Sequence, residues 1–126
     1  MNVILSIAFG GAIGAVSRYM LSSAIQNISG NSFPYGMLLC NILGSMILGI
    51  LYDSLSKGSL FSDNIKLFIQ VGILGSFTTF SAFSFETIDL LTNNKLLLSL
   101  MYIILSLVLC LIAAYVGLNI NKFLNW

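Results

Sequence analysis

Long apolar runs separated by short polar segments set the pattern of this chain. Each run is long enough to cross a bilayer as a helix, which takes about 20 mostly apolar residues. The four runs cover residues 3–25, 34–55, 65–91 and 96–120. The pattern therefore predicts an all-α membrane protein with four transmembrane helices, in which residues 1–126 form a single domain.

The segments between the runs carry residues that start or end helices. The first segment closes with Pro34, which suits the first turn of a helix. The second is the most polar, and either Ser62 or Asp63 can cap the third helix. The third, at residues 92–95, reads TNNK and predicts a tight turn.

Composition excludes several classes of protein. Of the 126 residues, 58% are hydrophobic and 7% are charged, with a mean hydropathy of +1.01, whereas soluble domains carry about 25% charged residues. The net charge of +1 comes with no basic cluster, so nucleic-acid binding is not expected. The chain has no histidine, no phosphate-binding loop and no nucleophile beside a base, so we expect no enzyme.

The positive charges are almost evenly divided between the two sides of the membrane. With four spans, both termini and the second connecting segment share one side, which holds Lys57, Lys66 and Lys122. Arg18 and Lys95 fall on the other side. Orientation normally follows an excess of Lys and Arg in the cytoplasm. This weak bias leaves two alternatives: a single orientation, or both orientations paired as an antiparallel homodimer.

The first span carries a stripe of small residues that ends in a cation. Gly10, Gly14 and Arg18 recur every four residues and so share one helix face. We expect this face to pack against another helix. Arg18 at membrane depth should face water, an acid or a passing anion, unless its long side chain extends to the interface.

Polar residues also mark the second and fourth spans. Asn41 offers two donors and one acceptor, for a hydrogen bond between helices or for a polar solute. Tyr102, Ser106 and Cys110 lie at i, i+4 and i+8 on one face of the fourth span. They could form a polar track, or the serine could bond back to its own helix.

The third span is longer than a straight crossing needs and has an unusually polar middle. Glycines and paired β-branched threonines weaken a helix there, so we expect a break between Gly75 and Ser81. A break at this depth is tolerated where the backbone is buried in protein or lines a cavity, and it frees carbonyl groups.

Phenylalanines follow at a spacing of three, so Phe77, Phe80 and Phe83 can share one side of the chain. Phenyl rings have positive edges, and edges turned inward would make a weak site for an anion. An aromatic packing ridge is the alternative.

Three stretches resemble the Fluc (CrcB) fluoride channels. They are GGAIGAVSRY at residues 10–19, PYGMLLCNILGS at 34–45 and GILGSFTTFSAFS at 72–84, in family order and at family spacing. The resemblance extends over essentially the whole chain. It implies a passive fluoride-selective channel that exports fluoride from the cytoplasm, acting as an antiparallel homodimer with two pathways. A structural sodium ion at the dimer centre and a bacterial inner-membrane location are further implications, and the chain has no basic residue ahead of the first run to suggest a cleavable signal.

The resemblance also implies roles for individual residues. The main-chain carbonyls of Gly75 and Thr78 match the sodium ligands. Cys110 and Ala82 stand where many relatives carry hydroxyls. The residues that match the family's fluoride pathway are Asn41, Phe80, Phe83, Ser81, Thr79, Tyr102, Ser106 and Arg18.

Two other functions remain possible at this point. A proton-coupled exporter of the small multidrug type needs a carboxylate deep in its first span, which holds none here. A membrane assembly or scaffold protein would use the same stripes only for packing. Glu86 and Asp89, late in the third span, are expected to cap the helix or to pair with Arg18 or Lys95.

Overall fold

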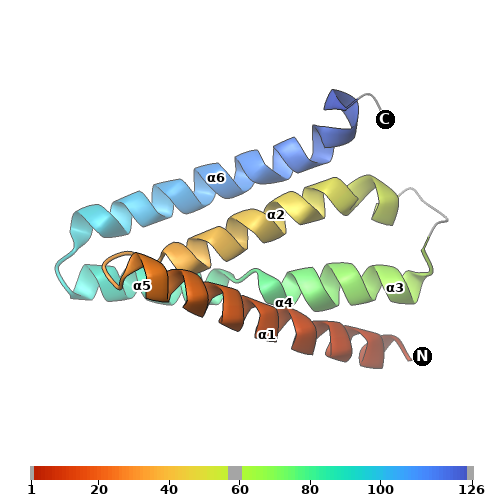
Figure 1. The fold of residues 1–126 in the computed structure, drawn as a ribbon, viewed down its shortest axis with the longest axis horizontal. Coiled ribbons are helices and arrows are strands. Elements are labelled where there is room, and N and C mark those ends of the chain that lie inside the picture. The colour runs from red at the N-terminus through yellow and green to blue at the C-terminus, as the bar shows by residue number, and fades with distance from the viewer. Residues whose placement is uncertain (1, 57–60, 125–126) are drawn as a thin grey trace.

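The computed structural model describes residues 2–56 and 61–124, which form helices packed side by side (Figure 1). Four helical stretches are long and apolar enough to cross a membrane, and the third of them runs from Asp63 to Thr92. Within the described residues there is no strand, so the predicted all-α, four-span architecture is confirmed. The elements are α1 (Val3–Ser29), α2 (Tyr35–Ser56), α3 (Asp63–Leu67), the π-helix η1 (Phe68–Leu74), α4 (Gly75–Phe77), α5 (Phe80–Thr92) and α6 (Leu96–Phe123).

Helix ends follow the local sequence. Pro34 directly precedes α2, and its carbonyl accepts a hydrogen bond from the Leu38 N–H at 3.2 Å. Ser62 caps α3, because its hydroxyl accepts from the Ile65 N–H at 3.4 Å. In the turn before α6, Asn94 adopts a positive φ of 57°, which asparagine tolerates better than most residues. The predicted helix starts and the tight turn are therefore confirmed.

The charged ends of the bundle are arranged as the four-span pattern predicts. Figure 1 shows the start of α1 and the end of α6 at the same end of the bundle as the end of α2 and the start of α3. Lys66 and Lys122 belong to that end, whereas Lys95 begins α6 at the opposite end. Lys57, the third cation assigned to the first end, lies outside the described residues.

Close packing between α1 and η1 depends on the glycine stripe. A Cβ atom at Gly14 would overlap the Ile73 carbonyl oxygen, and one at Gly10 would overlap the Phe68 carbonyl oxygen and lie 3.0 Å from the Gly72 Cα. Both glycines are buried. The prediction that this face packs against another helix is confirmed, and the partner is η1 of the third span.

We expect Gly10→Ala to destabilise the protein and its neighbour Gly11→Ala to leave it unchanged or slightly more stable. The added methyl group at Gly10 meets backbone, which forces the helices apart at a cost of roughly 1–3 kcal/mol. At Gly11 it meets only the Ser76 hydroxyl at 3.4 Å, and alanine favours a helix by about 1 kcal/mol over glycine. Thermal unfolding in detergent measures both variants. Equal unfolding temperatures would contradict the packing argument.

Apolar side chains divide between a small core and an extensive outer surface. Phe33, Leu38, Phe83, Leu90 and Tyr102 form the buried cluster, toward the end of the bundle that holds the turn before α6. Large apolar side chains on every span remain exposed. In a bilayer, lipid or a further subunit covers such surfaces. The chain is a multi-pass membrane protein.

Candidate functional site

Two extended residues separate α4 from α5 in the middle of the third span. Thr78 has φ −89° and ψ 153°, and Thr79 has φ −152° and ψ 130°. The sequence places the break between Gly75 and Ser81. In the structure Gly75 remains helical in α4, and the helix resumes at Phe80. The non-helical backbone is thus limited to the paired threonines, the β-branched part of the segment.

The Asn41 side chain holds this extended segment against α2. Its Oδ1 accepts a hydrogen bond from the Thr79 N–H at 2.8 Å, and its Nδ2 donates to the Thr79 carbonyl at 3.1 Å. One amide therefore satisfies both main-chain groups of Thr79. An asparagine amide carries two N–H donors, so a second donor of Asn41 is left for another partner.

The same hydrogen bonds redirect donors away from two main-chain carbonyls. In a continuous helix the Thr79 N–H would donate to the Gly75 carbonyl, but here it donates to Asn41. The Ala82 N–H would donate to the Thr78 carbonyl, but it donates to the Thr79 hydroxyl, the N-cap of α5, at 3.2 Å. The carbonyls of Gly75 and Thr78 thereby lose their usual helical donors.

A cavity of 240 Å³, which we call the central cavity, lies beside the extended segment. It is bounded by α2, α5 and α6 and by the two threonines. Five of the residues predicted for the pathway come together here: Asn41, Thr79, Phe80, Phe83 and Ser106. The remaining lining residues are Ser45, Thr78, Leu107, Cys110 and Leu111.

Two phenylalanines form the aromatic part of the central cavity. The ring centroids of Phe80 and Phe83 are 5.4 Å apart with planes inclined at 47°. Phe83 belongs to the buried core, whereas Phe80 is 74% exposed at membrane depth. Phe77 lies in α4, before the extended residues, and does not line the cavity. Of the three phenylalanines spaced three residues apart, only Phe80 and Phe83 therefore line the central cavity.

Ser106 supplies a hydroxyl that lacks a partner. It is 7% exposed and lines the central cavity. Among the side chains that the structure describes, which exclude that of residue 121, its Oγ is the one buried polar atom with no hydrogen bond. A buried hydroxyl without a partner costs roughly 1–3 kcal/mol. Such an atom beside a cavity points to a polar occupant.

Tyr102 is not part of the cavity wall. It is fully buried, and its hydroxyl donates to the Glu86 carboxylate at 2.6 Å. The expectation that Glu86 pairs with Arg18 or Lys95 is therefore wrong. Tyr102 on α6 reaches across the helix interface to the carboxylate on α5, which therefore has a hydrogen-bond donor that is not a cation.

The other acid of α5 and two pathway candidates also lie away from the central cavity. Asp89 accepts a hydrogen bond from the Asn93 side chain at 3.2 Å, so it too does not pair with a cation. Ser81 is exposed, and its hydroxyl lies 3.0 Å from the Thr79 hydroxyl. Arg18 is half-buried on α1, and no acid in the described part of the chain forms an ion pair with it.

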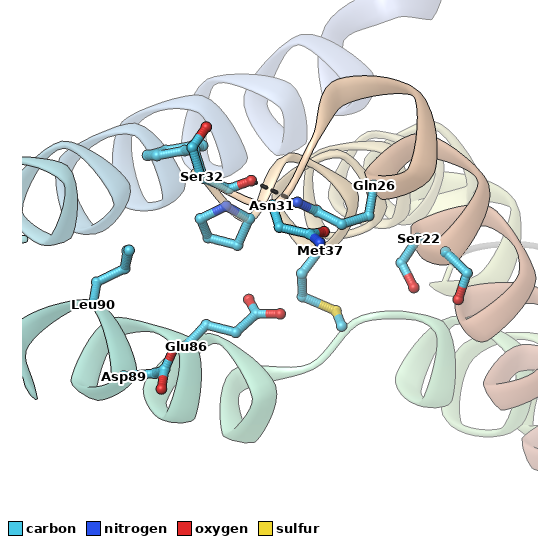
Figure 2. A pocket seen from close by; sticks show the side chains of 11 residues that line it. Ser22, Gln26, Asn31, Ser32, Met37, Glu86, Asp89 and Leu90 are labelled. Carbon is cyan, nitrogen blue, oxygen red and sulfur yellow. Dashed lines mark hydrogen bonds between the residues drawn. The ribbon is translucent and has the colours of Figure 1, made fainter. Parts of the chain in front are cut away.

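A second cavity of 290 Å³, the end cavity, opens between α1, the segment before α2 and α5 (Figure 2). Figure 2 shows the Glu86 carboxylate directed into this space, while that of Asp89 points away from it. Tyr102 lies between the two cavities. Its ring centroid is 5.5 Å from that of Phe33, which lines the end cavity, and 5.2 Å from that of Phe83, which lines the central cavity.

Gln26 was not singled out from the sequence, although it organises the end cavity. Its side-chain amide donates to the carbonyls of Gly30 and Phe33 and accepts from the Gly36 N–H. No spacing signal marks a glutamine near a helix end as the residue that fixes the following loop. Ser45, by contrast, follows Asn41 by one turn on the same face and could have been assigned to the cavity.

Comparison with known families decides where this arrangement belongs. The sequence model of the CrcB-like protein family, described as Camphor Resistance (CrcB), matches residues 5–118. The chain belongs to this family. The match includes most of each of the four spans and every residue that lines the central cavity.

Curated members of the CrcB family are similar over nearly their full length. A protein of Magnetococcus marinus named fluoride-specific ion channel FluC is 42% identical over 118 residues, covering 94% of this chain and 96% of that protein. Proteins of the same name from Shewanella baltica and another Shewanella species are 44% identical over 117 residues, covering 93% of this chain and 94% of theirs. These relatives are named as ion channels, which agrees with the expectation from the sequence that the chain is not an enzyme.

Proposed function

We propose that this chain forms a fluoride-selective channel that lets fluoride leave the cytoplasm passively, across the inner membrane of a bacterium. The name of the relatives supports fluoride as the ion. The central cavity supports a pathway for a small anion, because it joins polar groups to two aromatic rings within a membrane span, and the edge of such a ring carries a partial positive charge.

The single observation that carries this proposal is the set of donors in the central cavity. Asn41 keeps one N–H beyond the one that it donates to the Thr79 carbonyl, and the Ser106 hydroxyl has no partner. None of the described residues that line the cavity carries a charge. An anion there would be held by hydrogen bonds and ring edges, weakly enough to leave again, as conduction requires.

We infer that two copies pair antiparallel and that a sodium ion binds where their third spans meet. The carbonyls of Gly75 and Thr78 have lost their helical donors, and carbonyl oxygens suit a hard cation. Two such oxygens from each copy give four, so the site needs the partner. The ion's charge would lower the cost of bringing fluoride nearby.

Exposure and charge support the same pairing. Phe80 and Ser81 are exposed on the third span, where a second copy would cover them. The near-even division of Lys and Arg gives little preference for one orientation. A symmetric pair would contain two central cavities, hence two pathways. We assign Arg18 and Ser81 to their approaches and Tyr102, between the two cavities, to the route onward.

Purified protein in liposomes loaded with fluoride tests the function directly. A fluoride electrode should record release that needs neither nucleotide nor a proton gradient. Release no faster than from protein-free vesicles would refute the channel. Equal chloride release would leave a pore without selectivity, and release that requires a proton gradient would favour an exporter, although α1 holds no carboxylate for one.

We expect Ser106→Ala to raise the unfolding temperature while lowering fluoride flux. Removing the hydroxyl relieves a buried polar group of its unmet hydrogen bond, by roughly 1–3 kcal/mol. The same change removes a donor from the pathway. Tyr102→Phe is the comparison, because that hydroxyl is bonded to Glu86 outside the central cavity and its loss should reduce flux less. A larger loss in Tyr102→Phe would contradict the view that Ser106 is the more important hydroxyl of the pathway.

A further inference from the structure

The chain has two free cysteines in contrasting surroundings. Cys110 on α6 lines the central cavity and is partly exposed. Cys40 on α2 is fully buried, with its Sγ 3.9 Å from the Arg18 carbonyl oxygen, and lines none of the cavities described. A compound that enters the cavity can therefore meet one thiol and not the other.

The surroundings of Cys110 point independently to an occupant. Ser106, one helical turn earlier, is 7% exposed, lines the same cavity and has an unpartnered hydroxyl. Ser45 lines the same cavity from α2. At 240 Å³ the cavity exceeds the roughly 30 Å³ that one water occupies in the liquid. The thiol thus belongs to a space that can admit a small molecule.

We propose that Cys110 is a thiol-modification site at which a small, uncharged alkyl thiosulfonate shuts the ion pathway. The effect on flux rests on the proposed channel function. The uncharged class is chosen because the described residues that line the cavity are all uncharged and include leucines.

The reaction is thiol–disulfide chemistry. The thiol loses its proton to water, and the thiolate attacks the sulfenyl sulfur of the reagent. A new S–S bond joins Cys110 to the alkylthio group, while the S–SO2 bond breaks and its electron pair leaves with the alkylsulfinate. The cysteine is oxidised and the thiosulfonate is reduced, so no further reagent is needed. A reductant reverses the modification.

Modification at this position should block flux for two physical reasons. The alkylthio group occupies space between Ser106 and the phenylalanines of α5. It also covers a hydroxyl with an apolar group, so an anion passing there meets fewer donors. A longer alkyl chain should therefore block more completely than a methyl group.

The full-length protein in liposomes is treated with methyl or propyl methanethiosulfonate, and fluoride release is compared with that of the same untreated sample. Cys110→Ser and Cys40→Ala are treated in parallel. In the unaltered protein and in Cys40→Ala, we expect the methyl reagent to reduce fluoride release in part and the propyl reagent to reduce it to background. Fluoride release by Cys110→Ser should not change with either reagent. Mass spectrometry should find the adduct on Cys110, and a reductant should restore release.

Several outcomes would overturn the site. They are the absence of an adduct on Cys110, an adduct that leaves flux unchanged, or an equal loss in Cys110→Ser. Vesicles that release no fluoride before treatment would instead refute the channel itself, and the block with it. Because untreated flux is recorded for every sample, the two failures are distinguishable.

Discussion

Fluoride release from liposomes containing Phe80→Ile is expected to fall to the level of protein-free vesicles. Isoleucine keeps the hydrophobicity of the side chain and removes the ring, whose positive edge is the feature an anion can contact. Phe80 borders the central cavity together with Asn41 and Ser106. The same loss is expected for Phe83→Ile, since the two rings form one pair at 5.4 Å.

Phe85→Ile is the matched control for this prediction. Phe85 lies on the same helix and is 74% exposed, as Phe80 is, but it does not line the central cavity. Its replacement should leave release intact. The oligomeric mass of each variant in detergent separates loss of the ring from loss of assembly. Normal flux in Phe80→Ile would remove this ring from the pathway and leave it only a packing role.

The sequence could predict the spans because hydropathy in a membrane protein reports directly on the solvent. Each span must be apolar over its length whatever its neighbours are. Local chemistry also predicted the helix starts at Pro34 and Ser62. α1 ends at Ser29, four residues beyond the apolar run that was predicted as the first span. The helix stops where Gly30 adopts a positive φ of 83°.

The candidate site could be predicted only in part, because its hydrogen bonds join distant positions. Asn41 stands out in the sequence as a polar residue in an apolar span, yet its partner, Thr79, is 38 residues away in the extended segment of the third span. The i, i+4, i+8 spacing placed Tyr102 with Ser106 and Cys110. The tyrosine is long enough to reach across to Glu86, and only the shorter two side chains line the central cavity.

Replacement of Asn41 should have the largest effect on fold and flux together. Asn41→Leu removes both hydrogen bonds to Thr79 and leaves a main-chain N–H and carbonyl unpaired, each costing roughly 1–3 kcal/mol. We expect a lower unfolding temperature and no fluoride release above background. Thermal unfolding in detergent and liposome flux measure the two effects on the same preparation.

Asn41→Asp separates the two roles of this side chain. A carboxylate can still accept from the Thr79 N–H, but it cannot donate and it adds a negative charge to the wall of an anion pathway. Flux should therefore fall to background while the unfolding temperature falls less than in Asn41→Leu. Asn27→Asp, which adds the same charge at an exposed position late in α1, should conduct normally. Full conduction by Asn41→Asp would remove Asn41 from the pathway and leave it only as the residue that holds the extended segment, because repulsion between like charges in a low-dielectric site would otherwise exclude the anion.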